Sequence, residues 1–492
     1  MNLPDRRVVC LSFLGASLLL TLLFLVAEIG LLRIPYQRDY GEGHVLWLTM
    51  QGLDAYKPID SPPYVVNPYT PLYMLAARLV NLLSGDLLMA GRCLSLLSTL
   101  GIGLVLALTV YGVTPARAPR FLRMASAAGA GVFPLLTDSV TGWAPLMRVD
   151  MLALFLMFAG LYVYVCRGTR ERWQHVAGVL FVLALFTKET MLSAPLACLT
   201  FGLVVDFRRT LRVCAGAALL LAAGVLAANA VTHGGFLTHI VAYNRNPFSW
   251  RVAAVQIYDH LRSSWLWLAV AAATLLAVRN PAAVRSASPY GRAVIIAALN
   301  LAYATVLLVT LGKLGTNYNH FLAWDISACL LCGLFLYRFL ATSGLNRSRA
   351  AAGLCAVLLA GLLLPPMSLL HGLKQGLFGP NSWPEEDNVL ELIRQSPGPV
   401  FSENLLMLIQ ADKPVAVEPA TVTFLSLTGA WDEQPYVSLF QQQYFRLLVT
   451  EDIHFAERYT PAVTSAIDSA YVPRRRIGKY LLYYPRDGAT LR

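Results

Sequence analysis

Two carboxylates mark the part of the sequence that is richest in candidate catalytic residues. Asp39 and Glu42 lie three residues apart in a polar stretch, residues 33–86, that follows the first long apolar run. On a helix this spacing puts both carboxylates on one face. Beside a low-dielectric cavity a carboxyl pKa rises, which suits a general base acting on a hydroxyl group. The other interpretation is an interfacial loop in which both acids make ordinary hydrogen bonds, and spacing alone leaves both open.

Cations and polar side chains recur beside other apolar runs, on the same side of the predicted topology. Together they would suit a lipid-linked phosphate, which lies at headgroup depth while its chain stays in the bilayer. The alternative is that each Lys or Arg near a helix end packs its aliphatic stem on apolar surface and keeps its charged group in water, without binding a ligand. The candidate substrate-binding residues are Arg38, Lys57, Tyr69, Arg148, Asp150, Lys188, Glu189, Lys313, Asn317, Tyr318, Asn319 and His320.

The sequence contains no cluster of residues spaced as metal ligands. His320 has no second His at ligand spacing, so we expect it to form a hydrogen bond instead. Cys329 and Cys332 form a C-x-x-C, but they lie within an apolar run without a second pair, which favours packing over zinc or redox chemistry. We expect no metal ligands and no cofactor, although a divalent ion would be compatible with the sequence.

Composition places these residues in a membrane protein. Of the 492 residues, 57% are hydrophobic and only 14% are charged, and the mean hydropathy is +0.56. Globular proteins average about 25% charged residues. The net charge of +11 comes largely from short arginine-rich connections between apolar runs. We therefore interpret it as an orientation signal and expect no nucleic-acid partner.

The chain is predicted to be a polytopic α-helical membrane protein with about eleven transmembrane helices. Every second connection is arginine-rich, which places the N-terminus in the cytoplasm and residues 33–86, 233–263 and 371–492 outside the cytoplasmic (inner) membrane. Residues 71–84 are too short to span and contain Arg78, so we expect an interfacial helix. The expected spans are 8–32, 87–112, 124–142, 151–166, 173–187, 190–205, 213–232, 264–278, 293–312, 321–337 and 350–370.

The domain organisation follows from a change of character near residue 371. Residues 1–370 form the predicted membrane region, with 33–86 as its first extracytoplasmic loop, and 371–492 form a predicted extracytoplasmic α/β domain. That domain lacks a glycine-rich phosphate fingerprint, which favours a binding or shielding role. Its expected elements are helices at 384–395 and 456–471 and strands at 399–401, 414–417, 445–449 and 479–484, which suggest a βαβ sheet.

The order of several short motifs resembles the GT-C superfamily of membrane glycosyltransferases. The chain is most similar to family 39-like and aminoarabinose-transferase-like members, which use polyprenyl-phosphate sugars. Each motif is short, so the resemblance depends on their order and topology across nearly the whole membrane region. The motifs are Asp39-Tyr40-Gly41-Glu42-Gly43, Gly52 with Tyr56, Tyr69-Thr70-Pro71-Leu72-Tyr73, Ala90-Gly91-Arg92, Arg148-Val149-Asp150, Phe186-Thr187-Lys188-Glu189-Thr190 and Asn317-Tyr318-Asn319.

The resemblance implies an inverting glycosyltransferase with Asp39 or Glu42 as catalytic base. The family's adjacent Asp-Glu pair is here split by Tyr40 and Gly41, and both assignments stay open. Its implied partners are a polyprenyl-phosphate sugar donor, the lipid bilayer and a glycan, lipid or protein acceptor, and we expect a monomer. The alternative function is a transporter or flippase of a lipid-linked or small polar substrate, in which both acids would be replaceable.

Overall fold

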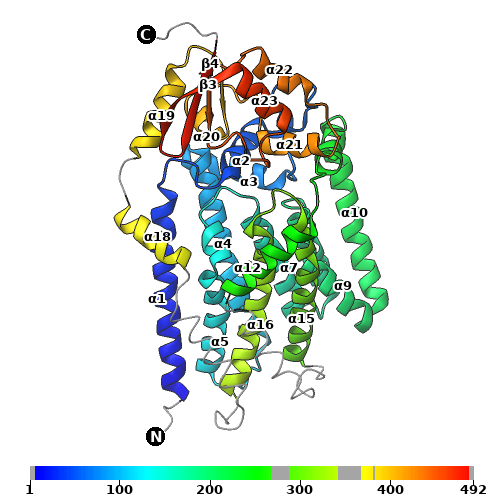
Figure 1. The fold of residues 1–492 in the computed structure, drawn as a ribbon. Coiled ribbons are helices and arrows are strands. Elements are labelled where there is room, and N and C mark those ends of the chain that lie inside the picture. The colour runs from blue at the N-terminus through cyan, green and yellow to red at the C-terminus, as the bar shows by residue number, and fades with distance from the viewer. Residues whose placement is uncertain (1–5, 265, 267–287, 342–366, 380–382, 487–492) are drawn as a thin grey trace.

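The computed structural model describes residues 6–264, 266, 288–341, 367–379 and 383–486. A bundle of long helices stands beneath a smaller α/β unit, with the amino end of the described chain at the far end of the bundle (Figure 1). Six of the described helices are long and apolar enough to cross a membrane. The protein is therefore a multi-pass membrane protein, as its composition predicted.

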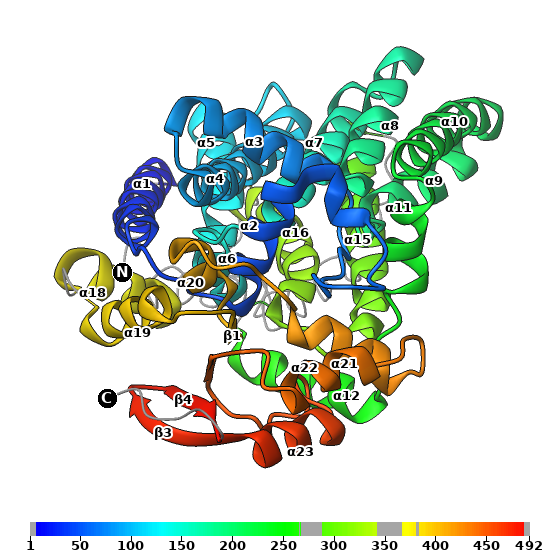
Figure 2. The ribbon, with the colours of Figure 1, turned by 90° about the horizontal axis from the view of Figure 1, so that it is seen from above.

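The helices of the bundle follow the apolar runs of the sequence. Their exposed faces carry leucine and valine, as expected for surfaces that contact lipid. Seen from above, α10 stands at the periphery beside α8 and α9 (Figure 2). The helices are α1 (Arg6–Leu32), α4 (Leu87–Val113), α5 (Arg120–Val132), α6 (Asp138–Trp143), α7 (Asp150–Arg167), α8 (Glu171–Leu185), α9 (Ser193–Val205), α10 (Phe207–Val231), α11 (Gly235–Leu237), α12 (Trp250–Ser263), α15 (Pro289–Leu307), α16 (Leu322–Ala341) and α18 (Met367–Phe378).

One expected span is not a single helix. Within 124–142 the helix α5 ends at Val132, a 3-10 turn covers Phe133–Leu136, and α6 begins at Asp138. Pro134 explains the break, because proline lacks the backbone N–H that would continue the α-helical ladder. The expected spans 264–278 and 350–370 lie largely outside the described residues.

Two short helices join the bundle to the α/β unit. They are α2 (Tyr40–Gln51) and α3 (Leu72–Ser84), with a 3-10 turn at Gly52–Tyr56 after α2. Asp39 caps α2, since its side chain accepts a hydrogen bond from the Gly41 amide. Helix α3 exposes Leu79, Leu82 and Leu83, which suits a helix lying on a membrane surface.

The C-terminal unit has a four-stranded sheet with the order β1-β2-β4-β3. Strands β1 and β2 are parallel, whereas β4 is antiparallel to both of its neighbours, β2 and β3. Helices pack around the sheet and bury its apolar side chains. The elements are α19 (Pro384–Gln395), β1 (Val400–Ser402), α20 (Leu405–Gln410), α21 (Pro419–Leu427), α22 (Gln434–Gln441), β2 (Leu447–Thr450), α23 (Pro461–Ala470), β3 (Tyr471–Ile477) and β4 (Tyr480–Pro485).

The expected elements of this unit are correct in part. The helix at 384–395 coincides with α19, and the helix at 456–471 is shorter, because Thr460 caps α23 and Pro461 starts it. The strand at 414–417 is wrong, since Val417 forms only an isolated bridge with Tyr64. Strand β3 was not expected, because its proline and three consecutive arginines hide the alternation of an edge strand.

Polar contacts fasten the C-terminal unit onto the first outer loop. The Tyr40 hydroxyl donates a hydrogen bond to Glu418, and the Tyr36 hydroxyl donates one to Asp387. The Tyr64 amide and carbonyl bond to the backbone around Val417. Residues 36–40 are consequently enclosed between the membrane helices and the C-terminal unit.

We expect Gly30→Ala to destabilise the packing of α1 against α18. A Cβ at Gly30 would lie 2.1 Å from the Cα of Gly376, so the two helix backbones must separate. Overpacking of this kind costs about 1–3 kcal/mol. Melting of the purified protein in lipid nanodiscs should show a lower midpoint for this variant. The matched control is Gly15→Ala in the same helix, where a Cβ meets no atom within 4 Å; equal melting of the two variants would contradict the predicted contact.

Candidate active site at the membrane junction

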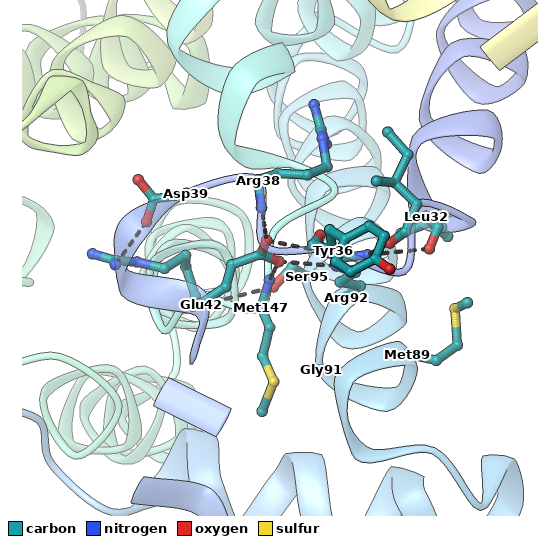
Figure 3. A network of polar contacts seen from close by, with 12 residues as sticks. Leu32, Tyr36, Arg38, Asp39, Glu42, Met89, Gly91, Arg92, Ser95 and Met147 are labelled. Carbon is teal, nitrogen blue, oxygen red and sulfur yellow. Dashed lines mark hydrogen bonds and ion pairs between the residues drawn. The ribbon is translucent and has the colours of Figure 1, made fainter. Parts of the chain in front are cut away.

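A buried ion pair organises the first outer loop. The Arg92 guanidinium, on α4, binds the Glu42 carboxylate with its Nε at 2.9 Å and its Nη2 at 3.0 Å (Figure 3). The same guanidinium donates to the backbone carbonyls of Leu32, Ile34 and Tyr36. All five N–H groups of Arg92 are thereby used. The chain between α1 and α2 therefore folds around the side chain of Arg92.

Every acceptor position of the Glu42 carboxylate has a hydrogen-bond donor. Its Oε1 also accepts a hydrogen bond from the Met147 amide at 3.0 Å, and its Oε2 accepts one from the Arg38 amide at 2.8 Å. The side chain is 0% exposed. Burial by itself would raise the pKa of Glu42, but Arg92 and the two amides hold it below its ordinary value. A carboxylate with four donors has no lone pair left for a substrate.

Asp39 is held differently. Its Oδ1 accepts hydrogen bonds from the Gly41 amide at 3.0 Å and from Arg148 Nη1 at 2.9 Å. Both bonds go to one oxygen, which leaves Oδ2 for a substrate. Asp39 lies apart from the Arg92 cluster, although only three residues separate it from Glu42 (Figure 3), and its partner is Arg148. The two carboxylates that spacing could not distinguish therefore differ in environment.

Asp39 and Arg148 line one pocket, which we call the Arg148 pocket, with a volume of about 310 Å³. Its walls combine the first outer loop, the loops before α12 and α16, and helix α21 of the C-terminal unit. Arg148 Nε is buried without a hydrogen-bond partner in the described part of the chain. Burial alone would lower the pKa of Arg148, but Tyr69, Asp39, Asp150 and Glu42 raise it. The site thus holds a permanent cation beside a carboxylate.

A second cluster fixes the elements beneath the pocket. Asp150, at the start of α7, accepts hydrogen bonds from Lys188 Nζ at 2.5 Å, Asn319 Nδ2 at 3.0 Å and Trp143 Nε1 at 3.1 Å. The side chains of Asp150 and Lys188 are 1% and 8% exposed. These contacts join the turn between α8 and α9 to the loop before α16. The pair neutralises itself, and Lys188 consequently offers less free charge than the sequence implied.

The neighbouring candidates have separate environments. Glu189 follows Lys188 in the turn, and its Oε2 is buried without a partner in the described chain. Burial raises the pKa of the Glu189 carboxyl, whereas the charges of Lys188 and Lys313 lower it. His320 Nδ1 lies 2.8 Å from the Thr310 hydroxyl, which agrees with the expected hydrogen bond. Within the described ranges no group of three or more His, Cys, Asp or Glu residues could hold a metal ion.

The structure brings some predicted residues to the Arg148 pocket and leaves others outside. Tyr69 and Asn317 line it. Lys57 is exposed and pairs with Asp54 at 3.1 Å, and Tyr318 is 55% exposed. Neither is among the residues that line this pocket. Arg38 is among the residues that line a different pocket, between residues 37–40 and the C-terminal sheet.

Three important residues were not assigned a role from the sequence. Arg92 carried a signal, because an arginine inside an apolar helix needs a partner. Glu418 accepts hydrogen bonds from the Tyr40 hydroxyl and the Thr421 amide, and Arg458 pairs with Glu403. Both lie in the C-terminal unit, hundreds of residues from the loop they meet. No local pattern could have indicated that contact.

The helical bundle and the C-terminal α/β unit together have the fold of two solved proteins. Structural comparison supports this assignment of the fold. No protein-family model matches the sequence, and no curated protein matches it significantly.

Two similar solved structures illustrate the relationship. ArnT from Cupriavidus metallidurans bound to undecaprenyl phosphate has a TM-score of 0.58 and 13% identity, with 96% of this chain and 97% of that chain covered. The archaeal oligosaccharyltransferase AglB from Archaeoglobus fulgidus, in complex with an inhibitory peptide and a dolichol-phosphate, has a TM-score of 0.55 and 12% identity, with 98% and 75% covered. At these identities the likeness establishes the fold.

We expect Glu42→Gln to lower the stability of the protein. Breaking a buried ion pair by changing one partner costs about 3–5 kcal/mol, because the other charge stays buried. Asp39→Asn, at the partly exposed pair, should melt close to the wild type in a thermal scan. Because the pKa of Glu42 is lowered in the folded protein, its stabilising contribution is present at neutral pH and lost as the pH falls through that lowered pKa. Equal melting of the two variants would contradict this assignment.

We also expect Gly41→Ala to displace Arg148. A Cβ at position 41 would lie 1.3 Å from Arg148 Nη1, so the guanidinium must leave Asp39. A charge-assisted hydrogen bond is worth about 1.5–3 kcal/mol, which corresponds to a loss of about tenfold or more in affinity for a phosphate ligand. Binding of inorganic phosphate to the purified protein, measured by isothermal titration calorimetry, should fall accordingly. Gly142→Ala, with no atom within 4 Å of the new Cβ, is the control that should bind normally.

Proposed function

We propose that the protein is an inverting glycosyltransferase that moves a sugar from a polyprenyl-phosphate donor to an acceptor hydroxyl. One observation carries the proposal: Asp39 and Arg148 open into the same junction pocket, whereas Glu42 is fully hydrogen-bonded. A general base and a fixed cation are what direct transfer from a phosphate leaving group requires.

In the proposed reaction Asp39 accepts the proton of the acceptor hydroxyl. The acceptor oxygen forms a bond to the anomeric carbon of the donor sugar, and the bond from that carbon to the lipid phosphate breaks. The phosphate leaves with the electron pair and is stabilised by the charge of Arg148, which lines the pocket. Binding of the phosphate to Arg148 would also weaken the hold of Arg148 on Oδ1 of Asp39 and free that carboxylate for the proton.

The lipid nature of the donor is supported by the solved neighbours. ArnT is described with undecaprenyl phosphate and AglB with a dolichol-phosphate. In this chain the Arg148 pocket is lined by residues of both the membrane region and the C-terminal unit, and a phosphate bound there would keep its lipid chain beside the helical bundle. Remaining substrate-binding roles are proposed for Tyr69, Asn317 and Lys313.

We further propose that the pocket faces the outer side of the cytoplasmic membrane. Arginine-rich connections, such as those around Arg123, Arg170 and Arg209, lie at the end of the bundle opposite the C-terminal unit. Catalysis would need no metal, since Arg148 already supplies the charge that a divalent ion would bring. The protein would act as a monomer.

The test is transfer of labelled sugar from a panel of polyprenyl-phosphate donors by the protein in lipid nanodiscs. Asp39→Asn should lose activity by about 10²–10⁴-fold, the usual contribution of a general base, while it remains folded. Excess EDTA should leave the wild-type rate unchanged. Full activity of Asp39→Asn would reject this base, restoration by a metal after EDTA would reject metal independence, and absence of turnover with every donor would favour a transporter.

A further inference from the structure

A polar pocket lies at the end of the bundle remote from the Arg148 pocket. Helix α7 begins at Asp150, beside the candidate active site, and ends at Arg167, next to this second pocket. The carboxyl ends of α7 and α9 and the amino ends of α8, α10 and α15 meet around it. We call it the Arg292 pocket, and its volume is about 280 Å³. Helices α7, α10 and α15 are candidate membrane spans, so their ends lie near lipid headgroups.

The Arg292 pocket carries an excess of positive charge. Among the described residues that line it, the charged ones are Arg209, Arg292 and Asp206. Arg209 donates hydrogen bonds to the carbonyls of Gly168 at 2.9 Å and Thr169 at 3.1 Å, which are neutral partners. Asp206 is exposed and caps α10, since its Oδ1 accepts the Arg209 amide. Two guanidinium groups against one carboxylate favour an anionic ligand.

Arg292 and Tyr164 offer the pocket hydrogen-bond donors that are not already in use. Neither side chain forms a hydrogen bond or an ion pair within the described part of the chain. Both side chains are half-buried, yet their polar atoms remain accessible to solvent. Both residues line the pocket. An accessible guanidinium beside an accessible phenol suits the acceptor oxygens of a phosphate group.

An apolar groove continues from this pocket along α8, α9 and α10. The groove has a volume of about 190 Å³ and shares Tyr164, Gln174 and Thr210 with the Arg292 pocket, and the rest of its lining is apolar. Helix α10 stands at the periphery of the bundle (Figure 2) and buries only Thr210 among its 25 residues. The groove has room for part of one alkyl chain and is too small for a helix. A cationic pocket that leads into an apolar groove matches an amphiphile with an anionic head.

We propose that the Arg292 pocket and this groove together bind one anionic phospholipid of the adjoining leaflet. The lipid phosphate accepts hydrogen bonds from Arg292 and Tyr164 beside the charge of Arg209, and one acyl chain lies in the groove between α8, α9 and α10. Basic pockets between membrane helices bind lipid headgroups in this way. A free anion would leave the groove empty, and a zwitterionic lipid would gain less from the charge. The inference does not rest on the proposed transferase activity.

The headgroup contact is tested by Arg292→Gln. Loss of this cation should weaken binding of phosphatidylglycerol about fivefold, the worth of one arginine beside an anionic lipid. The matched control is Arg208→Gln, because Arg208 is exposed in the first turn of α10 and does not line the pocket. An equal loss in both variants would indicate attraction to the basic surface as a whole and would overturn the proposed site.

The acyl-chain contact is tested by Ala218→Phe. Ala218 lines the groove and is exposed, so a phenyl ring can occupy the groove without entering a packed core, and it should weaken phosphatidylglycerol binding about threefold or more. Ala215→Phe places the same ring on an exposed position of α10 outside the groove and should bind as the wild type does. The two tests change different helices, so failure of one variant to fold leaves the other.

Binding is measured by native mass spectrometry of the full chain in detergent, titrated with phosphatidylglycerol, with phosphatidylcholine of the same acyl chains, with undecaprenyl phosphate and with inorganic phosphate. One phosphatidylglycerol bound in preference to the other probes, and weakened by Arg292→Gln and Ala218→Phe but not by their controls, supports the proposal. Equal binding of phosphatidylcholine, preference for undecaprenyl phosphate, displacement by inorganic phosphate, or unchanged binding in either pocket variant would overturn it.

Discussion

The contact between Arg92 and Glu42 is the constraint on which the rest of the site depends. A guanidinium buried at the top of α4 must satisfy five donors, and it does so with one carboxylate and the carbonyls of the chain that leaves α1. Those contacts fix where α2 begins. Helix α2 in turn places its capping residue, Asp39, at the junction of two pockets.

The two neighbouring acids consequently lie in different environments. Glu42 is surrounded by donors and serves the fold, whereas Asp39 keeps one oxygen free beside Arg148. The C-terminal unit completes the arrangement: Glu418 and Glu403 position Tyr40 and Arg458 between the two pockets.

The sequence predicted the helices that depend on a local pattern of residues. Hydropathy located the long helices, and Pro384 with acidic residues in the first turn located α19 to the residue. It could not separate Asp39 from Glu42, because the partner of Glu42 lies 50 residues away on another helix. Arg92 could have been recognised as a charge needing a partner. The contacts of Tyr40 with Glu418 and of Tyr36 with Asp387 could not be predicted, since these residues meet only when the C-terminal unit packs on the outer loop.

An experimental structure of the protein in nanodiscs with undecaprenyl phosphate tests the central claim most directly. The account predicts phosphate oxygens within hydrogen-bond distance of the Arg148 guanidinium, Asp39 facing the same pocket, and Glu42 still bound to Arg92. A phosphate bound elsewhere, or a Glu42 carboxylate released from Arg92 and turned toward the phosphate, would contradict it.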